Sequence, residues 1–306
     1  MRIKVLGSAA GGGFPQWNCG CANCSRLRRG VFRGRARSQT QVAVSATAGK
    51  WLLLNASPDL RQQILADAEL APAQGGRNTP IVGIILTSAD ADSVLGLLHL
   101  REFHPLRIFA TPSVRRALTK ENSLFRVLER SKPPVVWEEL PLGRQFSIER
   151  SGKMELFCEA VPLGGTFPDY VSSALKRKLR REEAVVGLVL RQGERQFFMA
   201  PSLSSRGEKW KRHVKESNLA LLDGTFWSDG ELVKVQGGGK TARQMGHLPI
   251  SGPDGLLEKM EALTKTRRVL IHLNNTNPVL DEESAENRAV RDAGWEVAYD
   301  GMEFEL

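Results

Sequence analysis

The order of predicted strands and helices is the feature that most limits how this 306-residue chain can fold. Apolar runs bounded by Gly, Pro and Asn predict strands at 1–6, 41–46, 50–54, 81–86, 107–111, 155–161, 185–191, 195–199, 219–222, 268–273 and 295–299. Helical periodicity predicts helices at 60–67, 94–102, 112–130, 172–182, 205–216, 253–264 and 281–292. In each half, strands come first in pairs and then alternate with helices. This order predicts an α/β protein with two β-sheets sandwiched between outer helices.

The chain contains no long linker rich in Pro, Gly or Ser, so we expect residues 1–306 to form a single domain. No stretch reaches the roughly 18 apolar residues that a membrane helix needs. The N-terminal residues also lack the apolar segment of about 7–15 residues that a secretory signal contains. We therefore expect a cytoplasmic protein that does not enter a membrane.

The net charge of +9 comes partly from two clusters of basic residues. The first cluster consists of Arg26, Arg28, Arg29, Arg33, Arg35 and Arg37, and the second of Lys176, Arg177, Lys178, Arg180 and Arg181. Neither cluster is interleaved with aromatic residues, as a platform for single-stranded nucleic acid would be, so we expect no nucleic-acid partner. Two interpretations stay open: solvated basic surface, or attraction of an acidic substrate or partner.

Three of the four cysteines fall within six residues, at Cys19, Cys21 and Cys24. Disulfides are rare inside cells, and one bridge here would leave an odd thiol. The spacing lets three thiolates converge on one ion without a regular element, with Gly20 permitting the tight turn. Soft thiolates favour zinc, which takes four ligands. The cluster predicts a structural Zn²⁺ site whose fourth ligand is distant in sequence. Cys158 lies in an apolar strand and is interpreted as a small buried hydrophobe.

Carboxylates and histidines follow three of the buried strands. These candidate ligands are Asp90 and Asp92 after 81–86, Asp223 after 219–222, and His272 at the end of 268–273, with His247 in a glycine-flanked loop. For any one of these segments a turn or capping role is the ordinary reading. Their combination predicts a shared site that can hold a metal. The other histidines, His99, His104 and His213, are interpreted as solvated or structural.

Several longer motifs resemble those of a known family. They are residues 7–19 (GSAAGGGFPQWNC), the Cys-x-Cys-x-x-Cys run, residues 55–64 (NASPDLRQQI), 96–98 with 100–102, 245–249 (MGHLP) and 274–278 (NNTNP). Together they cover nearly the whole chain. With these motifs the chain resembles the metallo-β-lactamase superfamily, and within it the B proteins of pyrroloquinoline quinone (PQQ) biosynthesis. The resemblance implies the metallo-β-lactamase fold, with a site between the two sheets.

The superfamily motif His-x-His-x-Asp-His falls on Ser88, Asp90, Asp92 and Ser93, so only its Asp is kept. The last position is usually His in the B proteins, and Ser93 departs from that pattern.

The resemblance also implies roles for residues later in the chain. Asp223 matches the superfamily's later Asp, and His272 matches its final His. His247 matches a loop histidine that relatives acting on phosphodiesters use as an acid. The fourth zinc ligand would lie beside the His272 strand, where Asn275 is the nearest candidate.

Three functions follow from the resemblance as alternatives. The B proteins are described either as carriers of the cofactor or its precursor, or as iron-dependent oxygenases that hydroxylate the tyrosine of a cross-linked Glu–Tyr precursor. In the second case Asp92, His247 and His272 are the catalytic residues, with Fe²⁺ or another divalent metal at Asp92 and His272, helped by Asp90 or Asp223. A phosphodiesterase with two zinc ions is disfavoured, because three of the four motif histidines are missing. The expected binding partner is then a small or peptide-derived PQQ precursor. The sequence is compatible with either a monomer or a homodimer.

Overall fold

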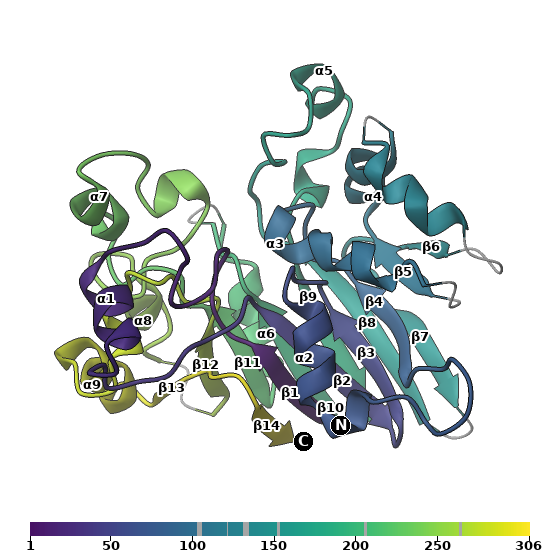
Figure 1. Cartoon of the computed structure of the whole chain (residues 1–306), viewed down its shortest axis with the longest axis horizontal. Coiled ribbons are helices and arrows are strands. Elements are labelled where there is room, and N and C mark those ends of the chain that lie inside the picture. Colours follow the sequence, from purple (N-terminus) through teal and green to yellow (C-terminus); the bar gives the residue numbers. More distant parts are fainter. Residues whose placement is uncertain (103–105, 121, 131–134, 152–153, 205–206, 263–264) are drawn as a thin grey trace.

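The computed structural model describes every residue except 103–105, 121, 131–134, 152–153, 205–206 and 263–264. Two seven-stranded sheets pack face to face, and helices cover their outer faces (Figure 1). The chain ends lie side by side, since the Leu306 amide donates to the Met1 carbonyl at 2.9 Å. The predicted α/β sandwich of two sheets is confirmed. No helix among the described residues is both long and apolar enough to cross a bilayer.

The first sheet has the strand order β14-β1-β2-β3-β4-β5-β6. These strands are β1 (Arg2–Gly7), β2 (Gln41–Thr47), β3 (Lys50–Leu54), β4 (Ile81–Ile85), β5 (Arg107–Ala110), β6 (Val136–Glu139) and β14 (Met302–Glu305). Strand β2 runs antiparallel to both β1 and β3, and β3 runs parallel to β4. Strands β1, β3 and β4 therefore point the same way and end at one edge of the sheet.

The second sheet has the order β13-β12-β11-β10-β9-β8-β7. Its strands are β7 (Phe146–Ser151), β8 (Met154–Pro162), β9 (Val186–Gln192), β10 (Arg195–Ala200), β11 (Leu219–Asp223), β12 (Arg267–Ile271) and β13 (Trp295–Val297). Strands β10, β11, β12 and β13 are mutually parallel. Their carboxyl ends also share one edge.

Both faces of each sheet are apolar, because one packs on the other sheet and one on helices. On β3, Leu52 and Leu54 belong to the core between the sheets, whereas Leu53 belongs to the outer core. On β10, Phe197 and Phe198 divide in the same way. This period of two places successive side chains on opposite faces, so a strand buried on both sides reads as a continuous apolar run.

The helices are short. The α-helices are α1 (Ala22–Arg28), α2 (Leu60–Ala66), α3 (Ala91–Val94), α4 (Pro112–Thr119), α5 (Ser173–Lys176), α6 (Trp210–Glu216), α7 (Glu231–Gln236), α8 (Leu256–Lys259) and α9 (Ala285–Asp292). The 3₁₀ turns are η1 (Ala68–Leu70), η2 (Leu95–Leu100), η3 (Leu124–Arg130), η4 (Arg181–Glu183), η5 (Arg243–Met245) and η6 (Pro278–Leu280).

Four predicted helices are much too long, and two others, at 205–216 and 281–292, begin later than expected, at Trp210 and Ala285. The helix expected at 94–102 is the short α3 followed by η2, and the one at 253–264 is only α8. The helix expected at 112–130 ends with α4, because the Asn122 side chain accepts the Leu124 amide and competes with the helical pattern. At 172–182 the helix stops at α5, since the extended Arg180 donates its amide to Ser113 instead. Tertiary contacts outweigh local propensity at these points.

Among the described strands and α-helices, five have no counterpart in the sequence-based prediction: β6, β7, β14, α1 and α7. The strand at 295–299 was expected to end the fold, yet β14 follows it and pairs with β1, with Val5 opposite Met302. Strands of four residues such as β6 and β14 carry too little periodicity to stand out. The cysteines also do not lie outside regular structure as expected, because Cys24 lies in α1 and Cys21 caps it.

Backbone contacts join the two sheets at the edge where the parallel strands end. The Leu273 amide donates to the Ser8 carbonyl at 3.0 Å, and the Ala10 amide donates to the Leu273 carbonyl at 2.8 Å. A second bridge links Ser88, after β4, with Val185, before β9. The loops that follow β1, β3, β4, β10, β11 and β12 thus gather at this edge.

Gly96 lets the segment that carries Asp92 lie close to the loop after β3. Its amide donates to the Ala56 carbonyl at 2.9 Å, and the Ala56 amide donates back to the Ser93 carbonyl at 2.7 Å. A Cβ at position 96 would lie 2.1 Å from the Ser57 carbonyl oxygen. Only glycine permits this backbone approach, which sets the position of α3.

We expect the Gly96→Ala substitution to destabilise the protein by about 1–3 kcal/mol, because the added methyl group forces α3 away from Ser57. Gly238→Ala is the matched control, since a Cβ at that position meets nothing within 4 Å. The measurement is chemical denaturation of both variants beside wild type. Equal stabilities of the two variants would contradict the close approach at Gly96.

Candidate functional site

The three clustered cysteines converge beside the loop that follows β12. Their sulfur atoms all lie within 4.8 Å of one another, with Cys24 buried and Cys19 and Cys21 half-buried. The Asn275 carboxamide faces them, its Nδ2 lying 3.1 Å from Cys19 Sγ, 3.7 Å from Cys21 Sγ and 3.4 Å from Cys24 Sγ. The other end of a carboxamide is an oxygen that can ligate a metal. Asn275 therefore lies beside the three sulfurs, as the resemblance implies for the remaining ligand.

The protonation of these thiols favours a bound cation. Burial raises the pKa of the Cys24 thiol to about 11. Burial also acts on Cys19, but hydrogen bonds led by the Cys21 amide outweigh it and lower the pKa of Cys19. A cation bound at the cluster would stabilise the Cys24 thiolate, which burial disfavours. The donor set of three sulfurs fits zinc, which binds as the thiols lose their protons.

Side-chain contacts connect the segment that contains the three cysteines to the residues that follow His272. The Asn23 side chain donates to the carbonyls of Asn275 and Asn277, at 3.2 and 3.0 Å. Farther along α1, Arg26 forms an ion pair with Asp281, with 2.6 Å between Nη1 and Oδ2. Arg26 of the first basic cluster therefore has a structural role. Arg37 of the same cluster is buried and donates hydrogen bonds to Ser8 and to the Ala298 carbonyl.

A cleft of about 770 Å³ lies at the sheet edge described above. Its lining comes from both sheets and includes Ser88, Asp90, Asp92, Ser93, His247 and His272. Three basic residues also line it, Arg181, Lys240 and Arg243. The second basic cluster of the sequence thus reaches the cleft through Arg181.

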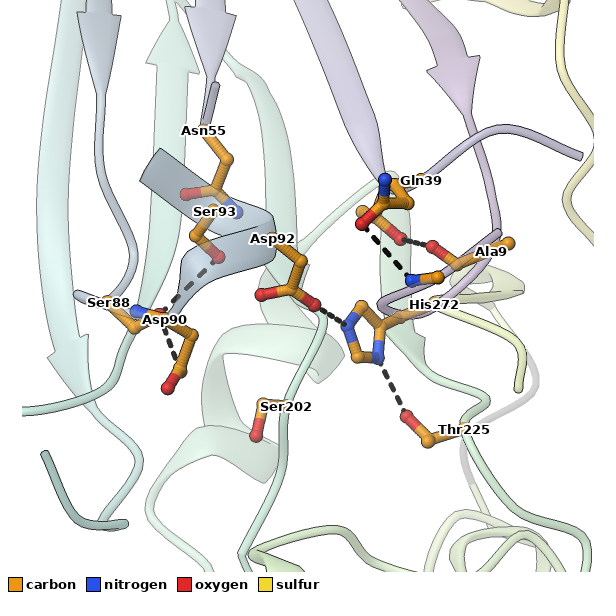
Figure 2. A network of polar contacts seen from close by, with 12 residues as sticks. Ala9, Gln39, Asn55, Ser88, Asp90, Asp92, Ser93, Ser202, Thr225 and His272 are labelled. Atoms are coloured by element: carbon orange, nitrogen blue, oxygen red, sulfur yellow. Dashed lines mark hydrogen bonds and ion pairs between the residues drawn. The ribbon is translucent and has the colours of Figure 1, made fainter. Parts of the chain in front are cut away.

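The two halves of the fold meet in the cleft at Asp92 and His272. Asp92 lies in α3 after β4, and His272 follows β12 of the opposite sheet. Figure 2 shows the two side chains pointing toward each other, with 3.1 Å between His272 Nε2 and Asp92 Oδ2. His272 has a φ of 63°, a strained value for a residue other than glycine, which the surrounding contacts must maintain.

Asp90 does not share this contact. Its carboxylate accepts from Ser88 Oγ at 2.8 Å, and Ser88 Oγ lies 3.4 Å from Ser93 Oγ, so these three residues form a separate wall of the cleft (Figure 2). Burial, followed by the nearby Asp92 carboxylate, raises the pKa of Asp90. Burial acts in the same direction on Asp92, but its hydrogen bond to His272 outweighs it and leaves the pKa of Asp92 lowered.

Asp223 lies at the end of β11 and has no exposed surface. Its Oδ1 accepts from the Thr225 amide at 3.0 Å and hydroxyl at 2.6 Å, and its Oδ2 accepts from the Leu203 amide at 2.8 Å. His247 Nδ1 lies 3.0 Å from the same Oδ2. Both oxygens are therefore occupied by protein donors. Burial lowers the pKa of His247, but Asp223 more than offsets this effect and leaves that pKa raised.

The cleft contains donors that fit one divalent metal. Two ligands held at right angles on bonds of about 2.1 Å lie about 3 Å apart, close to the separation of Asp92 Oδ2 and His272 Nε2. Asp223, His247 and His272 also have ligand atoms within 4.8 Å of one another. A carboxylate and imidazoles suit iron, manganese or zinc. Asp92 and His272 would hold such an ion, with His247 beside them.

Other polar residues that shape the site carry no chemical signal in the sequence. Asn55, with a φ of 68°, accepts the Thr87 amide on its side chain and so fixes the start of the Asp90 loop. The Tyr170 hydroxyl donates to the Ala89 carbonyl in that loop. Near the cysteines, Glu231 accepts from Thr276, and burial raises the pKa of Glu231 to about 7. Such contacts join distant segments, so spacing along the chain does not predict them.

The remaining cysteine and two of the other histidines, His99 and His213, lie away from both sites. Cys158 is fully buried between the sheets, as predicted. His213 is buried and stacks on Phe198, with 5.9 Å between ring centroids, which is the structural role expected of it. His99 is exposed. His104 lies outside the described residues.

The sequence matches the family model described as "Beta-lactamase superfamily domain" over residues 50–273. It is 42% identical over 308 residues to the coenzyme PQQ synthesis protein B of Azoarcus sp. (strain BH72), and 41% identical over 315 residues to that of Nitrosococcus oceani. Both alignments cover all of this chain and all of the relative. The chain belongs to the coenzyme PQQ synthesis protein B family. The resemblance inferred from the motifs is thereby confirmed.

Solved structures agree with this family. The zinc-bound PqqB from Methylobacterium extorquens is 36% identical, with a TM-score of 0.90 and full coverage of both chains. A diphosphatase of the PhnP family is 20% identical over 100% of this chain and 97% of its own, with a TM-score of 0.66, and shows the shared fold alone. The metallo-β-lactamase fold is therefore confirmed. Zinc in the PqqB relative supports the expectation of bound zinc.

The Cys21→Ser substitution should release about one zinc per chain and lower the melting temperature by at least about 5 °C, because a structural zinc site contributes directly to folding. Cys158→Ala is the matched control and should keep all of its zinc, since Cys158 lies between the sheets. Metal analysis and thermal unfolding measure both effects. Unchanged zinc content and melting temperature in the Cys21 variant would rule out the site.

Proposed function

We propose that this chain acts in the synthesis of PQQ, and that its cleft oxidises a Glu–Tyr-derived precursor at a single divalent metal. The full-length match to the PQQ synthesis B proteins supports the pathway. The contact between Asp92 and His272 is the observation that carries the chemistry, because it brings a carboxylate and an imidazole from opposite sheets to one point of the cleft. Iron held there by Asp92 and His272 would supply the activation of dioxygen that hydroxylation of an aromatic ring requires.

The reaction balances with dioxygen and a two-electron reductant. One oxygen atom enters the ring as a hydroxyl group, and the other leaves as water after taking up two electrons and two protons. The protein's own residues orient the substrate and hold protons. Arg181 and Lys240 line the cleft and suit the carboxylates of an amino-acid-derived precursor. His247, whose pKa is raised by Asp223, is the group beside the metal ligands that can hold a proton.

A carrier that binds the precursor without catalysis is the second candidate. The wall formed by Ser88, Asp90 and Ser93 favours it, because two superfamily histidines are replaced there by hydroxyl groups. A phosphodiesterase with two metals is less consistent with the cleft. Such an enzyme needs enough ligands for both ions, and both oxygens of Asp223 already accept hydrogen bonds from the protein.

We expect the gene to restore PQQ-dependent growth in a strain that lacks its own B protein. The variants Asp92→Ala and His272→Ala should reduce PQQ production at least tenfold, since each removes one donor of the metal pair. His99→Ala is the control, because His99 is exposed and lies outside the cleft lining.

The outcomes separate the candidates. Failure of soluble wild-type protein to restore growth would contradict a role in PQQ synthesis. Full activity of both cleft variants would contradict the metal-dependent oxidation and favour the carrier.

Restoring an imidazole at position 93 should strengthen metal binding in the cleft. We expect Ser93→His to tighten Fe²⁺ binding at least tenfold, about 1.4 kcal/mol, because Ser93 lines the cleft beside α3. His272→Ala should weaken binding by a similar factor. The measurement is an anaerobic titration of zinc-loaded protein with Fe²⁺, so that the cysteine site is already filled.

If His272→Ala binds Fe²⁺ as tightly as wild type, and Ser93→His binds no better, this edge of the fold is not a metal site.

A further inference from the structure

Asn55 follows β3 and lines the wall of the cleft, where 2% of its surface is exposed. Its side-chain oxygen Oδ1 accepts from the Thr87 amide at 2.8 Å and from the Thr87 hydroxyl at 3.0 Å. A backbone amide can only donate, so the atom that faces Thr87 must be the oxygen of the carboxamide and not its nitrogen. These two contacts fix the orientation of the Asn55 side chain.

The other end of this carboxamide is Nδ2, which carries two N–H donors. Among the residues that the structure describes, none accepts a hydrogen bond from Asn55 Nδ2. A buried donor without a partner is costly, and buried polar groups in folded proteins are therefore almost always paired. Because Asn55 lines the cleft, its free donor is available to a molecule bound there.

The backbone holds Asn55 in a conformation that is strained for a residue other than glycine, with a φ of 68°. Its amide donates to the Ile85 carbonyl at 2.8 Å, and its carbonyl accepts from Gln41 Nε2 at 2.7 Å. Strain of this kind is typical of residues that contact ligands, where surrounding contacts maintain it. Both the backbone and the side chain of Asn55 are thus fixed before a ligand binds.

The cleft separates this uncharged donor from its charged ones. Arg181 and Lys240 are exposed and suit the carboxylates of a substrate. Asn55 instead lies on the side of the cleft that carries Asp90 and Ser93 (Figure 2). A second carboxylate next to Asp90 would be repelled. The group that best suits Asn55 is therefore an uncharged oxygen that accepts a hydrogen bond.

We propose that Asn55 binds the substrate, with Nδ2 donating a hydrogen bond to an uncharged oxygen on an aromatic ring. Arg181 and Lys240 then hold the carboxylates at the other end of the molecule. The phenol oxygen of a tyrosine has the required chemistry, since it accepts a hydrogen bond and is uncharged at neutral pH. The proposal rests on the function proposed above, because it takes the substrate to be derived from Glu and Tyr. It adds that the ring enters the cleft first.

The first measurement follows the Asn55 side chain by NMR in full-length protein labelled with ¹⁵N at asparagine, with zinc retained and no other metal added. The variant Asn55→Asp identifies the Nδ2 signal, because that signal is absent from it. The dipeptide Glu-Tyr should shift one Nδ2 proton of Asn55 downfield, whereas Glu-Phe, which lacks the ring oxygen, should not. Asn122 is the internal control, since its side chain also accepts a backbone amide and it lies outside the cleft lining.

The second measurement compares the affinities of two dipeptides that have the same shape. Glu-(4-methoxyphenylalanine) has a ring oxygen that can only accept, and Glu-(4-ethylphenylalanine) has a CH₂ group in its place. Wild type should bind the methoxy compound about threefold more tightly, as expected for one net hydrogen bond.

Asn55→Asp keeps an oxygen toward Thr87 but replaces the donor with an acceptor, so it should lose or reverse this preference. Asn122→Asp makes the same exchange outside the cleft and should keep the preference. Arg181→Gln should weaken both compounds equally, because it acts on their carboxylates.

The outcomes separate this proposal from the proposed function. Equal affinity of wild type for the methoxy and ethyl compounds would overturn the role of Asn55, and so would an unmoved Asn55 signal while Glu-Tyr binds. Either result leaves a Glu–Tyr-derived substrate in place. Failure of every dipeptide to bind would contradict that substrate class itself. The wild-type preference tests the proposal even if Asn55→Asp does not fold.

Discussion

The backbone junction at Leu273 is the contact on which the functional part of this fold depends. Its amide and carbonyl both bond to the segment after β1, so the end of β12 in one sheet is tied to the end of β1 in the other. With the bridge between Ser88 and Val185, this junction adds directional backbone contacts to the apolar packing between the sheets, which by itself is non-directional. The junction lies next to His272, which faces Asp92 with 3.1 Å between Nε2 and Oδ2.

The sequence predicts the strands at the centre of this fold well and the edges poorly. Apolar runs such as 81–86 and 219–222 are long and buried on both faces, so their signal is strong. The edge strand β14 has four residues, and α3 stops where Gly96 contacts the backbone of Ser57. The ends of these elements depend on contacts between segments that are distant in the sequence. Local sequence patterns do not contain those contacts.

The candidate site shows the same division. The cysteine cluster can be recognised from the sequence, because its spacing alone suits a metal. Asn275 lies near the cluster as expected. The contact of Asp92 with His272 joins residues 180 positions apart. The motifs around Asp92 and His272 suggest a shared site. Only the fold shows that Asp90 lies apart from that contact and accepts a hydrogen bond from Ser88 instead. The segment that ends in Thr225, Asp-Gly-Thr after a buried strand, suits an ordinary turn as well as a site, so the sequence assigns Thr225 no role of its own.

One short segment contributes to both candidate sites. His272 and Asn275 are three residues apart, and between them the Asn274 amide donates to the Thr225 carbonyl. Asn275 faces the three cysteines, whereas His272 faces Asp92 in the cleft. A zinc ion bound at the cysteines would therefore hold the segment whose strained residue, His272, faces the cleft. Strain of this kind persists only where neighbouring contacts determine the backbone. The cysteine site is thus a part of the cleft's architecture as well as a contribution to stability.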